Sequence, residues 1–186
     1  MADLNSIGLL EVTSVAIGYL ALDAMLKAAS VDVLLARSIC SGKYLIAVGG
    51  DVASTQAAVE AGARLCTGAL IEKRVITRIH PSVFPAVAQA VDVMPEQIRA
   101  LGVVETFSAS SIIDVADAAV KSANVVLLKI HLAMALGGKG FVVMTGDVSS
   151  VESAVAVGAR VAAEEGMLVG RAVIAAPRKE LFRDWV

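Results

Sequence analysis

Short apolar runs alternate with amphipathic stretches along this chain, and the order of the two is the same in each half. In the first half the apolar runs cover residues 7–12, 31–39, 44–48 and 70–79, each bounded by glycine, proline or polar residues typical of turns. Between the runs, apolar residues recur three and four positions apart, which predicts helices with one buried face. These residues are Ile17, Leu20, Ala21, Ala24, Met25 and Ala28 in one stretch, and Val52, Thr55, Val59, Gly62 and Cys66 in the other. The first half is therefore predicted to fold in the order β-α-β-β-α-β.

A tandem repeat explains why the two halves share this order. The segment 7–12 (IGLLEV) matches 101–106 (LGVVET), and 23–29 (DAMLKAA) matches 117–123 (DAAVKSA). Further on, Gly50-Asp51-Val52 matches Gly146-Asp147-Val148. The offset between the copies rises from 94 to 96 residues, so the second copy carries a two-residue insertion opposite Cys40. Since insertions are tolerated in surface loops, this region is predicted to be a loop that differs between the copies.

The second copy repeats the first element by element, with a helix predicted at 148–164. Residues 80–99, which contain three prolines, are predicted to form a short helix plus a linker. The strands of the second copy are predicted at 101–106, 125–131, 141–145 and 167–174. The order is that of the ferredoxin-like split unit. We therefore expect an α+β protein of two tandem ferredoxin-like domains, residues 1–92 and 93–186.

Composition adds one point, which is where the apolar surface of the protein is buried. Hydrophobic residues make up 57% of the chain and aromatic residues only 4%, with a mean hydropathy of +0.76. No apolar run reaches the roughly 18–20 residues that span a bilayer, and the first residues lack the basic segment of a signal peptide. We expect a cytoplasmic protein without a membrane partner, whose excess apolar surface is buried between subunits. The net charge of −2, with acids and bases interspersed, also argues against nucleic acid as a partner.

Candidate chemistry is concentrated in one turn, Arg37-Ser38-Ile39-Cys40-Ser41-Gly42-Lys43, between two predicted strands. Cys40 is either a small apolar or pore-lining side chain, or a metal ligand. Cys66 is interpreted as a core residue, because it lies on the predicted helix stripe. Glu11 and Glu105 are repeat equivalents, for which we expect structural hydrogen bonds rather than acid–base chemistry. No arrangement of residues typical of an enzyme is recognisable.

The sequence resembles a known family at these same segments. Gly8-Leu9-Leu10-Glu11-Val12 followed by 23–29 resembles the opening of bacterial microcompartment (BMC) shell proteins, and Gly42-Lys43-Tyr44 and Gly49-Gly50-Asp51-Val52 resemble the later signature of that domain. Two copies resemble the tandem-domain trimer class. The residues around Cys40 and the stretch 79–83 are similar to shell proteins of propanediol-utilisation compartments, although Ser41 stands where a proline is expected.

This resemblance implies a structural protein of a microcompartment shell rather than an enzyme. It implies a flat, pseudohexameric homotrimer that tiles a shell facet and contacts other shell proteins at its edges. It also implies one [4Fe–4S] cluster per trimer, bound on the three-fold axis by Cys40 of three subunits. Such a cluster would conduct electrons across the shell, for instance to an enclosed redox enzyme.

The resemblance assigns two further groups of residues. Pore-lining residues are expected to be Ser38, Ile39, Cys40, Ser41, Gly42, Leu136, Gly137 and Gly138. Contacts at the trimer edge are expected from Lys27, Lys121, His80 and Arg178, although Lys27 and Lys121 are otherwise ordinary solvated cations near helix ends.

Two alternatives remain open at this point. The first is the same shell trimer with an empty pore that passes metabolites. The second is a ferredoxin-like regulatory module that binds a small molecule between subunits, because one fold serves many functions.

Overall fold

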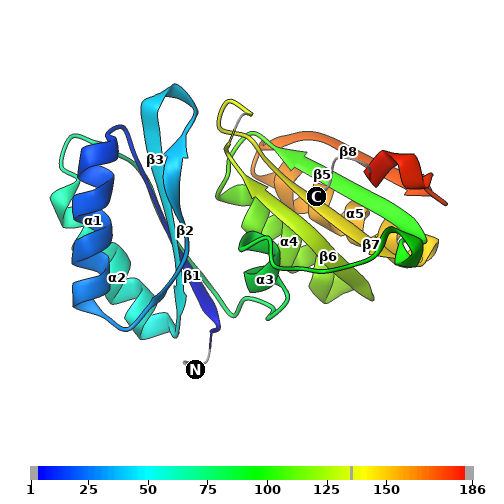
Figure 1. Ribbon diagram of the computed structural model, residues 1–186, viewed down its shortest axis with the longest axis horizontal. Helices are drawn as coiled ribbons and strands as arrows, with labels where there is room; N and C mark the ends of the chain where they lie inside the picture. The colour runs from blue at the N-terminus through cyan, green and yellow to red at the C-terminus, as the bar shows by residue number, and fades with distance from the viewer. Residues whose placement is uncertain (1–3, 135, 183–186) are drawn as a thin grey trace. The chain divides into compact units, whose positions relative to one another are not determined.

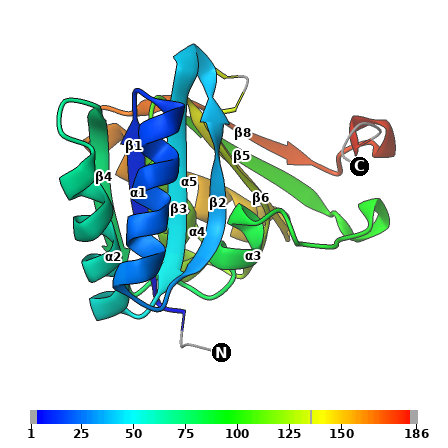
Figure 2. The same cartoon turned by 60° about the vertical axis from the view of Figure 1, so that its left-hand side comes forward.

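The computed structural model describes residues 4–134 and 136–182 of the chain. It divides into two compact units that correspond closely to the two copies of the repeat. Each unit has a four-stranded antiparallel sheet with two long helices on one face (Figures 1 and 2). The predicted α+β class and the β-α-β-β-α-β order are confirmed.

The first unit contains a sheet with the strand order β2-β3-β1-β4. This order is that of the ferredoxin-like unit, in which the two central strands belong to different β-α-β halves. Its elements are β1 (Ser6–Val12), α1 (Val15–Ala28), β2 (Asp32–Ile39), the 3₁₀ turn η1 (Cys40–Gly42), β3 (Lys43–Gly50), α2 (Val52–Leu65) and β4 (Leu70–Thr77), followed by the short α3 (Val83–Val87).

Local chemistry explains where the two helices of this unit begin. The Ser14 side chain accepts a hydrogen bond from the Ile17 N–H at the start of α1. Asp51 accepts from both the N–H and the hydroxyl of Ser54 at the start of α2, and so caps this helix. The Ser54 bonds lower the pKa of the Asp51 carboxyl.

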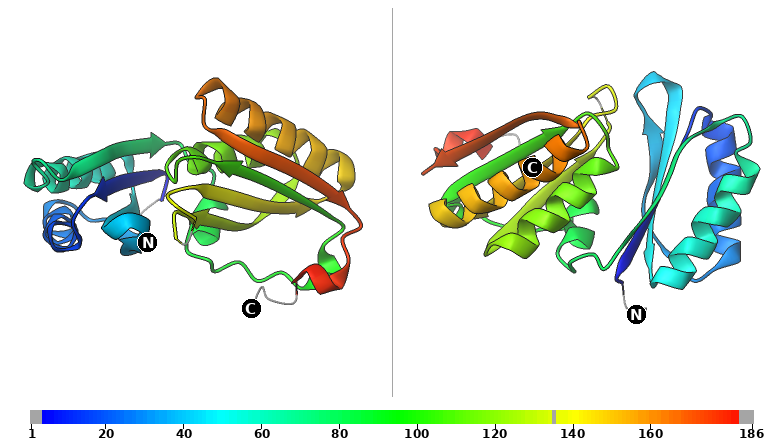
Figure 3. Two further views of the ribbon diagram at one scale, coloured as in Figure 1. Left: turned by 90° about the horizontal axis from the view of Figure 1, so that it is seen from above. Right: turned by 180° about the vertical axis from the view of Figure 1, so that it is seen from behind.

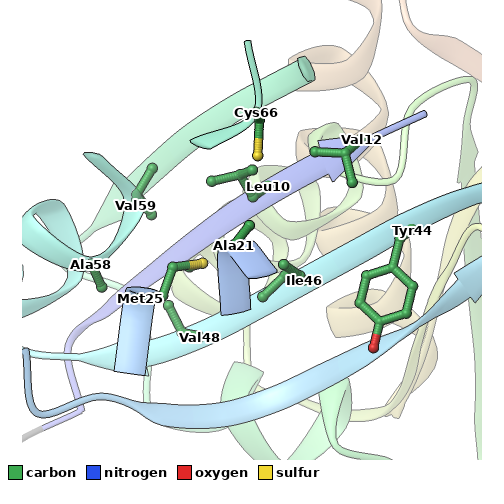
Figure 4. Packing of buried hydrophobic residues seen from close by; sticks show 10 residues of the cluster. All are labelled: Leu10, Val12, Ala21, Met25, Tyr44, Ile46, Val48, Ala58, Val59 and Cys66. Carbon is green, nitrogen blue, oxygen red and sulfur yellow. The ribbon is translucent and has the colours of Figure 1, made fainter. Parts of the chain in front are cut away.

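The core of the first unit lies between the sheet and the two helices (Figure 4). Leu10 and Ile46 of the central strands are fully buried, as are Ala21 and Met25 of α1. The predicted α1 stripe is partly wrong, because Leu20 is 58% exposed and Ala28 is exposed as well. Gly18 takes part in the buried face instead.

The second unit repeats this architecture with the strand order β6-β7-β5-β8 (Figure 3). Even its irregularities recur: β1–β4 shifts register after Glu11, and β5–β8 shifts after Glu105. Its elements are β5 (Ala100–Thr106), α4 (Ser111–Ser122), β6 (Val125–Leu132), β7 (Gly140–Gly146), α5 (Val148–Glu164) and β8 (Leu168–Ala175), with 3₁₀ turns η2 (Pro95–Gln97) and η3 (Lys179–Phe182).

The terminal turn η3 packs onto the second unit through one aromatic side chain. Phe182 is buried in a cluster with Leu101, Leu128 and Val143. Lys179 forms an ion pair of 3.1 Å with Glu96 of η2. Within the described ranges, no helix has the length and apolarity needed to cross a membrane.

Candidate functional site

The Cys40 turn is the tight connection of the β2–β3 hairpin. Ile39 and Lys43 are register partners, so only the three residues of η1 separate the strands. Gly42 adopts a φ of +71°, a conformation that glycine accepts without strain. Cys40 is half-buried and forms no disulfide. Of its neighbours, Ser38 is exposed and Ile39 is buried, while the side chain of Ser41 lies outside the described part of the chain.

An ion pair ties the end of this turn to the central strand. The Lys43 Nζ lies 2.9 Å from Glu11 Oε1, and the two side chains are 34% and 13% exposed. Glu11 is the register partner of Leu45, two residues beyond Lys43, so lysine and glutamate share one face of the sheet. The second unit contains the equivalent pair, Lys139 and Glu105, at 3.0 Å. The expected structural role of Glu11 and Glu105 is thus fulfilled by lysine partners.

Arg37 lies on the same face, opposite Leu45 in the β2–β3 register. Its Nε and Nη2 atoms are buried without a hydrogen-bond acceptor among the described residues. Burial lowers the pKa of this guanidinium. At the equivalent position of the second unit, His131 stacks on Phe141 with ring centroids 4.9 Å apart.

The loop that replaces the Cys40 turn in the second copy carries no cysteine. Gly137 and Gly138 have φ values of +65° and +95°, and a Cβ on either would meet nothing within 4 Å. Leu136 beside them is half-buried. The predicted loop and its two-residue insertion relative to the first copy are thus present, with open space beside both glycines.

Cys66 is a core residue, as predicted. Its thiol is fully buried at the end of α2, points toward Leu10 in Figure 4, and donates to the Gly62 carbonyl oxygen at 3.2 Å. Burial raises the pKa of this thiol, so it remains protonated at neutral pH. Nowhere in residues 4–134 and 136–182 do three or more His, Cys, Asp or Glu side chains gather as a metal site. The described part of one chain therefore offers one thiol outside the core, that of Cys40, and no complete ligand set.

The two lysines expected at the trimer edge occupy equivalent positions in the last turns of α1 and α4. Lys27 pairs with Asp23, and Lys121 with Asp117, each at 2.6 Å and at i,i+4 spacing. His80 follows β4, where its Nδ1 accepts from the Ser82 hydroxyl at 2.8 Å and from the Ser82 N–H at 3.3 Å. Arg178 is exposed just before η3.

A shallow depression of about 330 Å³ lies between α5 and β8 of the second unit. Arg171 and Ala156 line it, at the positions that Lys73 and Glu60 occupy in the first unit. There Lys73 and Glu60 form an ion pair of 2.6 Å. Ala156 thus stands beside this depression where the first unit has the acidic partner of its ion pair.

The fold places this chain in the class of proteins that are built from two tandem ferredoxin-like domains. In this chain, both domains carry an equivalent lysine–glutamate ion pair at the hairpin turn. The BMC domain family matches residues 6–79 and 100–177, which is most of both copies. The chain therefore belongs to the BMC domain family.

Relatives found by sequence and by structure support this assignment. The bacterial microcompartment shell protein PduT of Citrobacter freundii is 44% identical over 182 residues, 98% of each chain. The carboxysome assembly protein CcmO of Synechocystis sp. is 34% identical over 170 residues, 84% of this chain and 55% of that protein. A crystal structure of a microcompartments protein from Desulfitobacterium hafniense DCB matches with a TM-score of 0.93 and 46% identity, covering 97% of this chain and 99% of that one. The chain is thus a tandem-domain microcompartment shell protein, with a structural rather than an enzymatic role.

Sequence reasoning missed two features of the site. It treated Glu11 and the Gly42-Lys43 motif separately, although both recur in the second copy as Glu105 and Gly138-Lys139. Their joint recurrence was the available signal for an ion pair. The burial of Arg37 had no such signal, since an arginine in a hairpin strand usually reaches solvent.

Proposed function

We propose that this chain is a shell facet tile that assembles as a homotrimer, so that six similar domains form a pseudohexamer. Exposed apolar side chains on α1 support self-association: Tyr19 is 62% exposed, and Leu20 and Leu26 are exposed beside it. Large apolar side chains left in water on one helix are typical of an interface. The remaining exposed surface of the tile is then available to other shell proteins.

A [4Fe–4S] cluster on the three-fold axis, held by Cys40 of three subunits, is the second part of the proposal. Thiolates are the ligands that such clusters take, normally four per cluster. One chain contributes only Cys40, because Cys66 is committed to the core. Three-fold assembly supplies three thiols, and water or a small thiol completes the fourth iron. Cys40 fits this role by its chemistry and by its place in a short turn rather than in the core.

The chain's own contribution is to hold and surround the cluster. Cys40 would ligate iron. Ser38, Ile39, Ser41 and Gly42, together with residues 136–138 of the second copy, would border the cluster. Hydrogen bonds from backbone N–H groups of the turn to the cluster sulfurs would tune the reduction potential. When bound, the cluster supplies one-electron exchange, which would connect a redox carrier outside the shell with an enclosed redox enzyme.

A metabolite pore without a cluster is the second candidate function. The open space beside Gly42, Gly137 and Gly138 favours it, because a Cβ on any of these glycines would meet no described atom within 4 Å. The third hypothesis was a regulator that binds a small molecule. It rested on the ferredoxin-like fold alone, and the chain belongs to the BMC domain family, whose relatives named above include a shell protein.

The tile edge is proposed to involve Lys27, Lys121, His80 and Arg178. Lys27 and Lys121 support this proposal by their equivalent positions, since repeated contacts around a pseudohexamer need the same group in both domains. Their Asp partners would hold each lysine near its own helix until a neighbouring tile offers backbone carbonyls.

Metal content separates the two candidate functions. The protein is purified without oxygen, and iron and acid-labile sulfide are measured per trimer, together with absorption and EPR spectra. We expect iron and sulfide in the wild type, loss of both in Cys40→Ala with the trimer intact, and retention in Cys66→Ala. The last variant is a matched control, because the second copy carries Ala162 at the equivalent position. Wild-type trimer that stays free of iron after reconstitution would overturn the cluster and leave the pore.

A further inference from the structure

Strand β8 is an outer strand of the second sheet, so among the described residues one side of its backbone has no partner strand (Figure 1). Two hydrogen bonds at the ends of its ladder with β5 show which residues face that side. The Phe107 N–H donates to the Met167 carbonyl oxygen, and the Ala176 N–H donates to that of Arg99. Because inward and outward residues alternate along an antiparallel strand, every second residue of β8 directs its N–H and C=O away from β5. These residues are Arg171, Val173 and Ala175.

The side chains leave this edge apolar and open. Residues 171–175 are all exposed, with Val173 at 37% and Ile174 at 38%, and Arg171 is the one charged side chain of the strand. Strand β4 has the same place in the first sheet, but it carries the charged run 72–74 (EKR) at its centre. Charged side chains, lysine above all, protect a sheet edge from pairing with another chain. Of the two equivalent edges, β8 is therefore the one that can accept a further strand.

The depression between α5 and β8 adds selectivity to this edge. Arg171 lines it and forms no ion pair with any residue that the structure describes. In the first unit the equivalent cation is already neutralised by the ion pair between Lys73 and Glu60, whereas Ala156 takes the place of the acid in the second unit. Glu152, one helical turn before Ala156, also lines the depression and so disfavours a ligand with several acidic groups. The charges thus fit a ligand that brings one carboxylate to Arg171.

We propose that β8 is a site of strand addition, at which an extended segment of a partner protein pairs with the outer edge and places one carboxylate beside Arg171. Main-chain hydrogen bonds give such a complex its affinity, and alternate side chains give it specificity. A residue directly opposite Arg171 on the added strand would have its Cβ about 4.5–5.5 Å away, which is close enough for an ion pair. A second copy of β8 is a poorer occupant, because it brings the charge of another Arg171 and no acid. This inference does not depend on the cluster.

The probe is a synthetic peptide of the same length as β8, in which threonine and valine alternate around one central glutamate. Its binding to the intact protein is followed by fluorescence anisotropy, and the same peptide with glutamine in place of glutamate is the matched control. The wild type is expected to bind the glutamate peptide roughly two- to fivefold more tightly, the range of an exposed ion pair. Arg171→Gln is expected to bind both peptides alike. Lys73→Gln, the equivalent change on β4, is expected to keep the preference.

Two variants separate the side-chain and main-chain parts of the site. Ala156→Glu copies the first unit, so its own carboxylate is expected to pair with Arg171 and remove the preference for the glutamate peptide. Val173→Pro removes an outward N–H that makes no bond to β5, a position at which an edge strand tolerates proline. This variant is expected to lose binding of both peptides. If it does not fold, hydrogen exchange of the wild type decides, because the bound peptide should slow exchange in β8.

Three results would overturn the inference. The first is no binding of either peptide at about 1 mM, or equal affinity of the wild type for both. The second is unchanged hydrogen exchange in β8 when the peptide is bound. The third is a smaller assembly of Val173→Pro in light scattering without peptide, because β8 would then pair with a second copy. None of these measurements involves iron, so a negative result leaves the proposed function of the shell tile untouched.

Discussion

Gly18 of α1 lies directly against the ring of Tyr44 on β3, with no room for a Cβ between them. The second unit fills the same space from the opposite side. There Ile112 replaces Gly18, and Gly140 replaces Tyr44, so that a Cβ on Gly140 would lie 2.8 Å from Ile112 Cγ2. The two copies have exchanged a large and a small residue across the helix–sheet contact while conserving the packing between them.

This exchange predicts strong coupling between positions 18 and 44. Gly18→Ala overpacks the contact and is expected to lower the free energy of unfolding by about 1–3 kcal/mol. Tyr44→Gly leaves a cavity and is expected to cost about 3–5 kcal/mol. The double variant Gly18→Ile/Tyr44→Gly copies the second unit and should cost less than Tyr44→Gly alone, as measured by urea denaturation at one protein concentration. A double variant at least as unstable as the sum of the separate Gly18→Ile and Tyr44→Gly losses would contradict the packing.

The two thiols are predicted to differ in reactivity. Burial raises the pKa of Cys66 above its usual value near 9.0, so its reactive thiolate is scarce at neutral pH, whereas half-buried Cys40 lies in a surface turn. Iodoacetamide added to folded, iron-free protein should label Cys40 first, as followed by mass spectrometry of the peptides. Equal labelling of the two cysteines would show that Cys66 is not in the core.

The raised pKa of Cys66 also predicts a dependence of stability on pH. The folded state favours the neutral thiol, so the contribution of this group is complete below the unfolded-state pKa and declines as pH rises through the folded one. When the pH is raised from neutral to about 10, the free energy of unfolding should therefore fall less in Cys66→Ala than in the wild type. Parallel loss of stability in both proteins would contradict the burial effect.

The N-caps of the two equivalent helices predict different responses to acid. Asp51 caps α2 through Ser54, whereas Asp147 makes no side-chain cap and bonds Arg99 at 2.9 Å instead. Because Ser54 lowers the pKa of Asp51, its contribution is present above the unfolded-state pKa near 3.8 and is lost as pH falls through the folded one. Asp51→Ala should lower the thermal midpoint more than Asp147→Ala at pH 7, and the difference should shrink below pH 4. A difference that persists in acid would show that the cap does not depend on the charge.

The edge proposal predicts that Lys27→Glu damages tiling but spares the trimer. The substitution reverses a charge at a contact repeated around every tile, and it places like charges at Asp23 and position 27, which costs the helix only about 0.2–0.5 kcal/mol. Electron microscopy should show hexagonal sheets for the wild type and for the control Lys73→Glu, but none for Lys27→Glu. Monomeric Lys27→Glu protein in light scattering would contradict the edge position.

The fold was predictable because the sequence pattern of each element recurs in the second copy of the repeat. The matched segments placed β1 and β5, their helices and the differing loop correctly, with boundaries within about three residues. The buried face of α1 was less predictable, because Leu20 satisfies the helical period and yet is exposed. The spacing of hydrophobic residues does not distinguish a side chain that packs into the core of its own domain from one that is exposed on the surface of the chain.

For the candidate site, the sequence pointed to individual residues but not to the contacts between them. Cys40 and its turn could be found from the absence of a cysteine in the second copy. The bond between Lys43 and Glu11 depends on the antiparallel register of β1 and β3, and the contact of Gly18 with Tyr44 depends on where α1 crosses the sheet. Both are long-range relationships that no local pattern encodes. The roles assigned to the pore and edge residues stay predictions.

Iron K-edge anomalous diffraction from anaerobically grown crystals tests the central proposal most directly. The account predicts anomalous density on a crystallographic or local three-fold axis, within bonding distance of the Sγ atoms of three Cys40 residues. Thiols that lie far apart, or that turn into their own subunits with no density between them, would contradict the cluster and leave a plain shell tile.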